Sequence, residues 1–207
     1  MAAAIGQAVH AGVEAMLKPL PLRPVEAARR AFDHELVSVP ASDIAADPGA
    51  FSDVETMLSV YARDVAPTFQ PVMVEQPFRL SIAGVEVTGT IDAADDGVRD
   101  HKTTAGKTIN GRPPRFDPER YDFQLALYDM GYEVLTGRRP AYLQLDVLTR
   151  RGTYRPYRRT PSRGEAIDVL GIVAAGIARG DYEPTGAYSG ACAYCPFAAK
   201  GCRYAVV

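Results

Sequence analysis

The spacing of apolar residues changes along this chain from a helical to an alternating pattern and back. Residues 2–18 carry an apolar stripe at Val9, Val13 and Met16, which is typical of one helix face, and the prolines that follow end that helix. The same pattern predicts helices from about residue 25, over 52–66, over 118–135 and over 162–179. Alternation and turn signals predict five strands, over 72–80, 85–93, 98–103, 141–149 and 153–159.

The order of these elements defines the expected fold. Helices followed by three strands, a helix, two strands and a last helix predict an α/β domain, with a mixed central β-sheet flanked by helices. Local signals are expected at the element boundaries: the caps Ser52 and Ser162, the helix stop Gly137, and the hairpin turns Ala83-Gly84 and Arg151-Gly152. Because no internal repeat or linker is evident, we expect a single domain over residues 1–207.

Charge is distributed unevenly, although the net charge is only −2. Residues 1–100 carry 7 basic and 15 acidic side chains, whereas residues 101–207 carry 16 basic and 10 acidic ones. Between residues 137 and 163 there are eight arginines, and Asp146 is the only acidic residue. Arginine at this density favours a surface that contacts phosphate groups. The alternative is an ordinary solvated face.

Two acidic residues and a lysine mark the second and third predicted strands. Asp92 ends one strand, and Asp100 and Lys102 flank His101 on the next. Because strand side chains alternate, Asp100 and Lys102 share a face and His101 points the other way. Two carboxylates and an ammonium on one face can hold a divalent metal beside a water, as metal-assisted phosphodiester hydrolysis requires. The plainer alternative is a turn-entry aspartate and an exposed salt bridge.

Three further polar residues extend this set. Gln124 and Tyr128 lie four residues apart and therefore share one face of the helix that follows the strands. His10 lies in the first helix four residues after Gly6, where a glycine would allow another backbone to approach closely. Each has an ordinary alternative, a surface pair or a packed core histidine. Glu75 is interpreted as an unremarkable strand residue.

Taken together, these motifs resemble the RecB-like branch of the PD-(D/E)XK nuclease superfamily. The branch has a Gly-x-x-x-His helix, a Gly-x-x-Asp strand, an Asp-x-Lys strand and a Gln-x-x-x-Tyr helix. The matching segments occur in the same order, and they are residues 6–10, 89–92, 100–102 and 124–128. The resemblance covers nearly the whole chain and implies the restriction-endonuclease-like core of that superfamily.

The resemblance also implies a role for each residue. His10, Asp92, Asp100 and the backbone carbonyl of His101 would bind Mg²⁺ or Mn²⁺. Lys102 would position the attacking water, and Gln124 and Tyr128 would orient Lys102 or the scissile phosphate. Basic residues of the loop over 105–118 and of the later arginine-rich segment would contact DNA: Lys107, Arg112, Arg115, Arg150, Arg151 and Arg155.

All three cysteines lie within eleven residues, as Cys192, Cys195 and Cys202. This spacing is typical of metal ligands and resembles the C-terminal cluster of the iron–sulfur subset of these nucleases, which includes the CRISPR-adaptation exonucleases. That likeness implies a structural [4Fe–4S] cluster that fixes the tail, residues 180–207, against the first helix. No cysteine precedes Cys192, so the fourth ligand is absent. We therefore expect a truncated start, an incomplete or lost cluster, or zinc with an outside ligand.

The sequence thus predicts a metal-dependent DNA nuclease, and by analogy an exonuclease that acts on single-stranded ends. The main alternative is a catalytically silent DNA-binding or assembly module of the same fold, and a third is a zinc-stabilised protein without nuclease activity. The lack of a nucleotide-binding Gly-Lys motif argues against an attached helicase. A stand-alone nuclease with a recombination or CRISPR-adaptation partner would fit. No membrane-spanning run or leader is evident, so the cytoplasm is expected, or the host cytoplasm for a viral protein.

Overall fold

A computed structural model describes residues 1–18, 21–82, 84–104, 116–181 and 202. The chain divides into two compact units, residues 1–167 and 168–207. The first unit contains the sheet and most of the helices, and the second contains all but the first residues of helix α6 (Arg163–Arg179). The expectation that the tail packs on the first helix concerns residues that lie mostly outside the described part, and it stays a prediction.

The first unit is built on a five-stranded sheet in the order β1-β2-β3-β4-β5. The strands are β1 (Met73–Ile82), β2 (Val85–Ala94), β3 (Val98–Thr104), β4 (Leu143–Thr149) and β5 (Thr153–Arg159). Strands β3 and β4 are parallel and all other neighbours are antiparallel. A parallel pair needs a crossover, and helix α5 (Asp122–Thr136) lies in that connection. The predicted mixed sheet is therefore confirmed.

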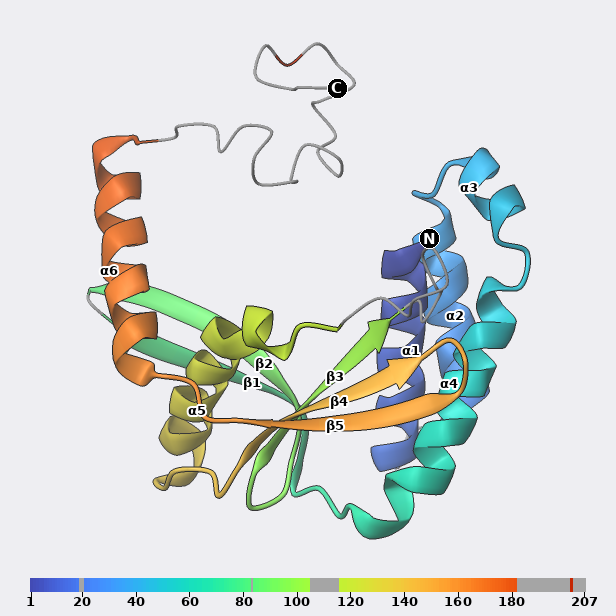
Figure 1. The fold of residues 1–207 in the computed structure, drawn as a ribbon, viewed down its shortest axis with the longest axis horizontal. Helices are drawn as coiled ribbons and strands as arrows, with labels where there is room; N and C mark the ends of the chain where they lie inside the picture. The colour runs from blue at the N-terminus through green and yellow to red at the C-terminus, as the bar shows by residue number, and fades with distance from the viewer. Residues whose placement is uncertain (19–20, 83, 105–115, 182–201, 203–207) are drawn as a thin grey trace. The chain divides into compact units, whose positions relative to one another are not determined.

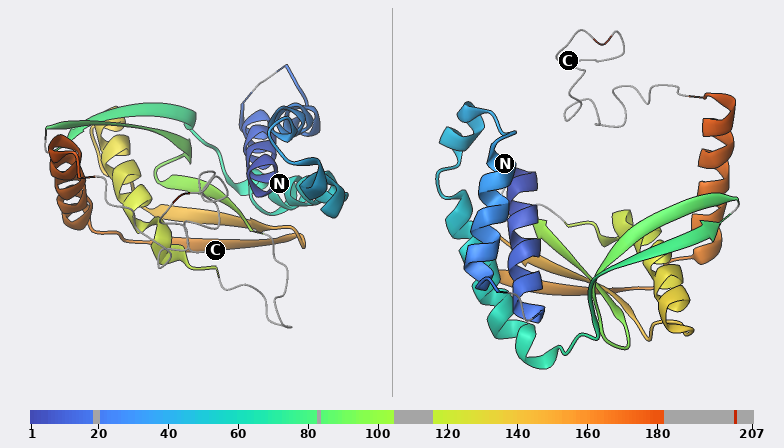
Figure 2. Two further views of the ribbon diagram at one scale, coloured as in Figure 1. Left: turned by 90° about the horizontal axis from the view of Figure 1, so that it is seen from above. Right: turned by 180° about the vertical axis from the view of Figure 1, so that it is seen from behind.

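Helices cover both faces of this sheet (Figure 1). Helix α4 (Ala50–Asp64) contacts β4 and β5, whereas α5 contacts β1, β2 and β3. Helices α1 (Ala2–Leu17) and α2 (Pro24–Leu36) pack against each other and against α4, and α1 also reaches β3 (Figure 2). The short helix α3 (Ala41–Ala46) and the 3-10 helices η1 (Ala66–Thr68) and η2 (Pro118–Tyr121) complete the order.

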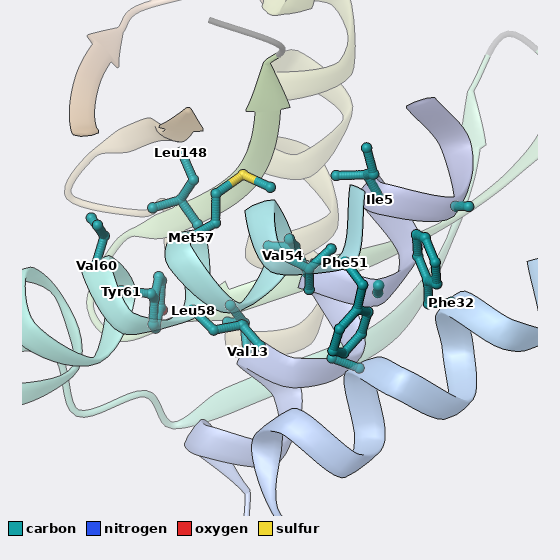
Figure 3. Close-up of a cluster of buried hydrophobic side chains, with 14 of the residues drawn as sticks. Ile5, Val13, Phe32, Phe51, Val54, Met57, Leu58, Val60, Tyr61 and Leu148 are labelled. Carbon is teal, nitrogen blue, oxygen red and sulfur yellow. The ribbon is translucent and has the colours of Figure 1, made fainter. Parts of the chain in front are cut away.

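Strand β4 separates two hydrophobic cores, and every one of its residues is buried. Leu145 and Val147 pack with α5, whereas Leu148 joins the core formed by α1, α2 and α4 (Figure 3). The rings of Phe32 and Phe51 meet edge to face in that second core, with 5.4 Å between their centroids. The face of β4 that carries Leu148 also holds Gln144 and Asp146, which are buried and hydrogen-bonded to each other and to the Tyr154 hydroxyl.

The local signals in the sequence set most of the element boundaries. Gly137 ends α5 in the left-handed conformation, with φ of 74°, and the Ser162 hydroxyl accepts a hydrogen bond from the Glu165 N–H at 3.2 Å, as predicted. Helix α4 begins at Ala50 after Gly49, not at Ser52, and α3 was not expected. A Cβ atom at Gly6 would lie 3.7 Å from its nearest neighbour, the Thr103 hydroxyl, so the neighbour at this glycine is a side chain in ordinary contact, where the approach of another backbone was expected.

None of the helices in the described part of the chain has the length and hydropathy needed to cross a bilayer.

Helix α5 approaches the sheet closely because two glycines accommodate one aromatic ring. A Cβ atom would lie 2.7 Å from the Phe78 ring at Gly131 of α5, and 2.5 Å from it at Gly89 of β2. The replacement Gly131→Ala should therefore force the ring or the helix to move, and we expect the free energy of unfolding to fall by about 1–3 kcal/mol. Urea denaturation measures this change.

The matched control is Gly171→Ala in α6, where a Cβ atom would meet nothing within 4 Å. Alanine is the better helix former, so this replacement should leave stability unchanged or raise it by up to about 1 kcal/mol. Equal effects at the two positions would contradict the packing argument.

Candidate metal and nuclease site

The strands that carry the predicted carboxylates separate next to those side chains. Strands β2 and β3 pair only at residues 93–94 and 98–99. Beyond that point, the backbone N–H of His101 donates to Oδ2 of Asp92 at 2.7 Å, and Nε2 of His10 donates to the His101 carbonyl oxygen at 2.9 Å. Two side chains thus replace the partner strand, which brings residues 10, 92 and 101 together as the sequence motifs suggested.

The second carboxylate, Asp100, is held by α5 and by its own strand. Asp100 is fully buried, and Nζ of Lys102 lies 3.0 Å from its Oδ1 and 2.7 Å from its Oδ2. The Gln124 amide donates to Asp100 Oδ1 at 3.0 Å and to the Tyr128 hydroxyl at 2.7 Å. Both α5 residues therefore lie at the site. Gln124, however, binds Asp100, whereas the sequence led us to expect that it would orient Lys102 or the scissile phosphate.

The His101 side chain lies on the opposite face, against helix α4. Its Nε2 is 3.1 Å from the Tyr61 hydroxyl, and the imidazole is buried. Burial, and then the nearby positive charge of His10, lowers the pKa of His101 to about 3. The ring is therefore neutral at physiological pH and anchors the backbone groups that face the cavity.

Glu75 also belongs to the site, although the sequence was interpreted otherwise. Ligand atoms of His10, Glu75 and Asp92 all lie within 4.8 Å of one another. Glu75 has a positive φ of 48° in β1 and lies opposite Asp92 in the β1–β2 hairpin. The sequence could have shown this placement, because the hairpin turn pairs Ile82 with Val85. Glu75 lies seven residues before Ile82 and Asp92 lies seven residues after Val85, so the two face each other across the hairpin.

These side chains line one open cavity of about 440 Å³. Its wall is formed by α1, α2, β1, β2, β3 and α5, and the polar residues on it are Gln7, His10, Glu14, Glu75, Thr90, Asp92, Asp100, Lys102, Gln124 and Tyr128. Among the lining residues that the structure describes, the acidic ones are Glu14, Glu75, Asp92 and Asp100, and Lys102 is the single lysine or arginine. The cavity therefore concentrates negative charge.

Burial and mutual repulsion disfavour the ionised form of three of these carboxylates and raise their pKa values. Burial and then the Asp92 charge raise the pKa of Glu75 to about 7. Burial also raises the pKa of Asp92, and burial together with repulsion by Asp92 raises that of Asp100. Lys102 offsets part of this effect at both aspartates. Like charges held this close favour any cation that can bind between them.

Two details of the cavity fit a divalent cation. Oδ2 of Asp100 is buried, and although the Lys102 ammonium lies 2.7 Å away, the two atoms do not have the geometry of a hydrogen bond. Nε2 of His10 donates to the His101 carbonyl oxygen, so the other ring nitrogen, Nδ1, faces Asp92 Oδ2 at 3.6 Å. This nitrogen and the carboxylate oxygen are close enough to bind one cation between them. Oxygen ligands with one imidazole are suitable for Mg²⁺ or Mn²⁺.

The predicted DNA contacts on β4 and β5 differ in their surroundings. Arg150 is almost buried, and its guanidinium binds Asp47, at 2.5 Å, and Asp53. Two carboxylates neutralise its charge, and the pair with Asp53 joins the end of β4 to helix α4, so Arg150 offers less positive charge to a phosphate than the sequence suggested. Arg151 and Arg155 are exposed, on the β4–β5 turn and on β5.

Other predicted residues fall outside the described part of the chain. They are Lys107, Arg112, Arg115, Cys192 and Cys195. Cys202 is described and half-buried. The cysteine site therefore stays a prediction.

Comparison with known proteins identifies the family. The model of the PD-(D/E)XK nuclease superfamily matches residues 1–200. No curated protein matches the chain. Among solved structures, the crystal structure of a "Putative exonuclease" from Eubacterium rectale is similar, with a TM-score of 0.58 and 16% sequence identity. The match covers 87% of this chain and 70% of that protein, and at this identity it shows a shared fold.

The raised pKa values predict how metal binding depends on pH. A divalent cation competes with protons for Glu75, Asp92 and Asp100, so affinity should rise with pH between about 5.5 and 7.5, roughly tenfold per pH unit for each proton released. Mn²⁺ should accordingly raise the melting temperature more at pH 7.5 than at pH 5.5. The sign follows because the metal binds only the ionised carboxylates.

Differential scanning fluorimetry with Mn²⁺ measures this effect. Glu75→Gln should weaken the Mn²⁺-induced shift, whereas Glu86→Gln, at an exposed position of the same hairpin, should not. A shift that is independent of pH, or equal in the two variants, would remove Glu75 from the metal site.

Proposed function

Because the chain belongs to the PD-(D/E)XK nuclease superfamily, we propose that it is a divalent-metal-dependent deoxyribonuclease that hydrolyses single-stranded DNA from an end. The observation that carries the proposal is the meeting of Asp92, Asp100 and Lys102 at one cavity. Two carboxylates from neighbouring strands, with an ammonium 2.7 Å from one of them, supply what metal-assisted phosphodiester hydrolysis needs. Glu75 and His10 support it by adding ligands on the Asp92 side.

The residues that would hold Mg²⁺ or Mn²⁺ are His10, Glu75, Asp92, Asp100 and the His101 carbonyl oxygen. When bound, the metal would polarise a phosphate oxygen and lower the pKa of a coordinated water. The Lys102 ammonium would orient the attacking water and offset the negative charge that develops on the phosphate.

The helix α5 residues have positioning roles in this proposal. Gln124 holds Asp100 Oδ1, and the Tyr128 hydroxyl fixes the Gln124 amide in turn. This chain of hydrogen bonds leaves the other oxygen of Asp100, Oδ2, to the Lys102 ammonium 2.7 Å away and to a metal. Direct attack by water requires no covalent intermediate with the enzyme.

The cysteine site is a separate part of the proposal and rests on sequence spacing. Cys192, Cys195 and Cys202 would bind an iron–sulfur cluster, or zinc with an outside ligand. Their role would be structural, in the tail of a cytoplasmic nuclease that works with a recombination or CRISPR-adaptation partner. Metal analysis of the purified protein distinguishes iron from zinc.

Removal of Lys102 should abolish cleavage while sparing DNA binding. Lys102→Ala and Asp100→Asn should each slow the degradation of end-labelled single-stranded DNA in Mn²⁺ by at least about 100-fold, because each removes a group that acts on the reacting phosphate or its metal. EDTA should stop cleavage by the parent protein. The label position shows from which end products are released.

The matched control is Arg79→Ala, which removes one positive charge from an exposed position of the β1–β2 hairpin. It should cleave as the parent does. Normal cleavage by Asp100→Asn would refute the metal site. No cleavage by a folded parent protein that still binds DNA would favour the catalytically silent module.

A further inference from the structure

Three aromatic rings pack together near Lys102 and have no part in the proposed hydrolysis. They belong to Phe116, Tyr121 at the end of η2, and Tyr157 of β5. Phe116 stacks on Tyr121 with 5.5 Å between centroids and an interplanar angle of 12°, and it contacts Tyr157 at 5.3 Å. All three are partly exposed. We call this group the aromatic ledge.

The ledge adjoins the proposed catalytic lysine. Nζ of Lys102 lies 5.0 Å from the centroid of the Tyr121 ring. Lys102 also borders the cavity, so one side chain faces both the acidic cluster and the rings. A phosphate held at Lys102 would therefore place its own nucleotide, or the next one, within reach of the ledge.

The sheet register places Tyr157 on the same face as the site. Asp100 pairs with Leu145, and Leu145 pairs with Tyr157. Directly paired residues point to the same face, and neighbouring strands are about 4.8 Å apart, so Tyr157 lies roughly 10 Å from Asp100 across the sheet. Lys102 likewise pairs with Val147, and Val147 pairs with Arg155, so Arg155 lies on the same face as Lys102, two strands away.

The ledge is fixed by an ion pair that is independent of DNA. Arg159 of β5 binds both carboxylate oxygens of Asp122, at 2.8 and 2.6 Å. Asp122 immediately follows Tyr121, and Arg159 lies two residues after Tyr157, so the pair ties the two elements that carry these rings. A surface that is already ordered loses little entropy when it binds a ligand.

Charge around the ledge favours a polyanion. Arg155 is exposed and makes no ion pair within the described residues, whereas Arg159 is neutralised by Asp122. Ordered aromatic rings next to cationic side chains are how proteins bind single strands without sequence preference, because every base offers a π-face. In a duplex, both faces of an internal base are occupied by its neighbours.

We propose that the aromatic ledge of Phe116, Tyr121 and Tyr157 is a base-stacking subsite, which binds an unpaired nucleobase next to the phosphate at Lys102. This inference rests on the proposed function and gives it a source of selectivity for single strands. The same rings also cover part of the α5 core, so the test must separate stacking from packing.

The experiment compares two oligonucleotides with equal charge. Fluorescence anisotropy in Ca²⁺ measures the binding of single-stranded DNA with ordinary bases and of the same length with consecutive abasic sites. A stacked base contributes about 1–3 kcal/mol, so the parent should prefer the ordinary strand by about 5- to 150-fold. Tyr157→Leu and Phe116→Leu, which keep apolar volume, should lose most of this preference and keep the affinity for the abasic strand.

Phe123→Leu serves as the control, because Phe123 is an exposed aromatic residue of α5 outside the ledge, and it should keep the full preference. Melting temperatures establish that each variant is folded. Because two ledge variants are measured, the test still holds if one of them does not fold. Base preference that persists in both leucine variants, or its absence in the parent, would overturn the ledge. Failure of the nuclease proposal can be told apart from failure of the ledge proposal. In that case the parent protein would not cleave DNA in Mn²⁺, whatever its preference between the two oligonucleotides.

Discussion

The site depends on two side chains that take the place of a neighbouring strand as hydrogen-bond partners of the His101 peptide groups. Where β2 leaves β3, the peptide N–H and carbonyl of His101 lose a neighbouring strand and bind the side chains of Asp92 and His10. An unpaired buried peptide group costs about 1–3 kcal/mol, so folding itself draws these side chains into place. The imidazole of His101, held by Tyr61 on the other face, fixes the strand from behind. The candidate site is thus assembled by the same hydrogen bonds that complete the sheet.

The electrostatics of the site oppose the stability of the fold that carries it. Glu75, Asp92 and Asp100 are kept close together and away from water, and each has a raised pKa as a result. Lys102 provides one ammonium for this group. A hydrophobic core would be more stable with apolar residues at these positions. A cation bound at the proposed metal site would relieve the repulsion that remains between these carboxylates.

Periodicity and turn chemistry were sufficient to predict the sheet, most helix boundaries and the residues that share a face, because these features depend on neighbours in the sequence. Glu75 escaped notice because its meaning depends on register, which follows only when the hairpin is counted from its turn. The surroundings of Arg150 could not be derived, since its partners Asp47 and Asp53 lie about a hundred residues away. Helix α3, with six residues, is too short for a periodic signal.

The ion pairs of the arginine-rich segment have a consequence for how the protein responds to ionic strength. Of its eight arginines, Arg150, Arg159 and Arg163 already bind carboxylates of this chain. Cations neutralised within the protein displace no counterions from a nucleic acid, and each phosphate contact on a single strand adds only about 0.7 to the slope of log affinity against log salt. Binding should therefore weaken with added salt less steeply than the composition of the segment suggests, and base stacking, which salt does not screen, would carry a larger share of the affinity.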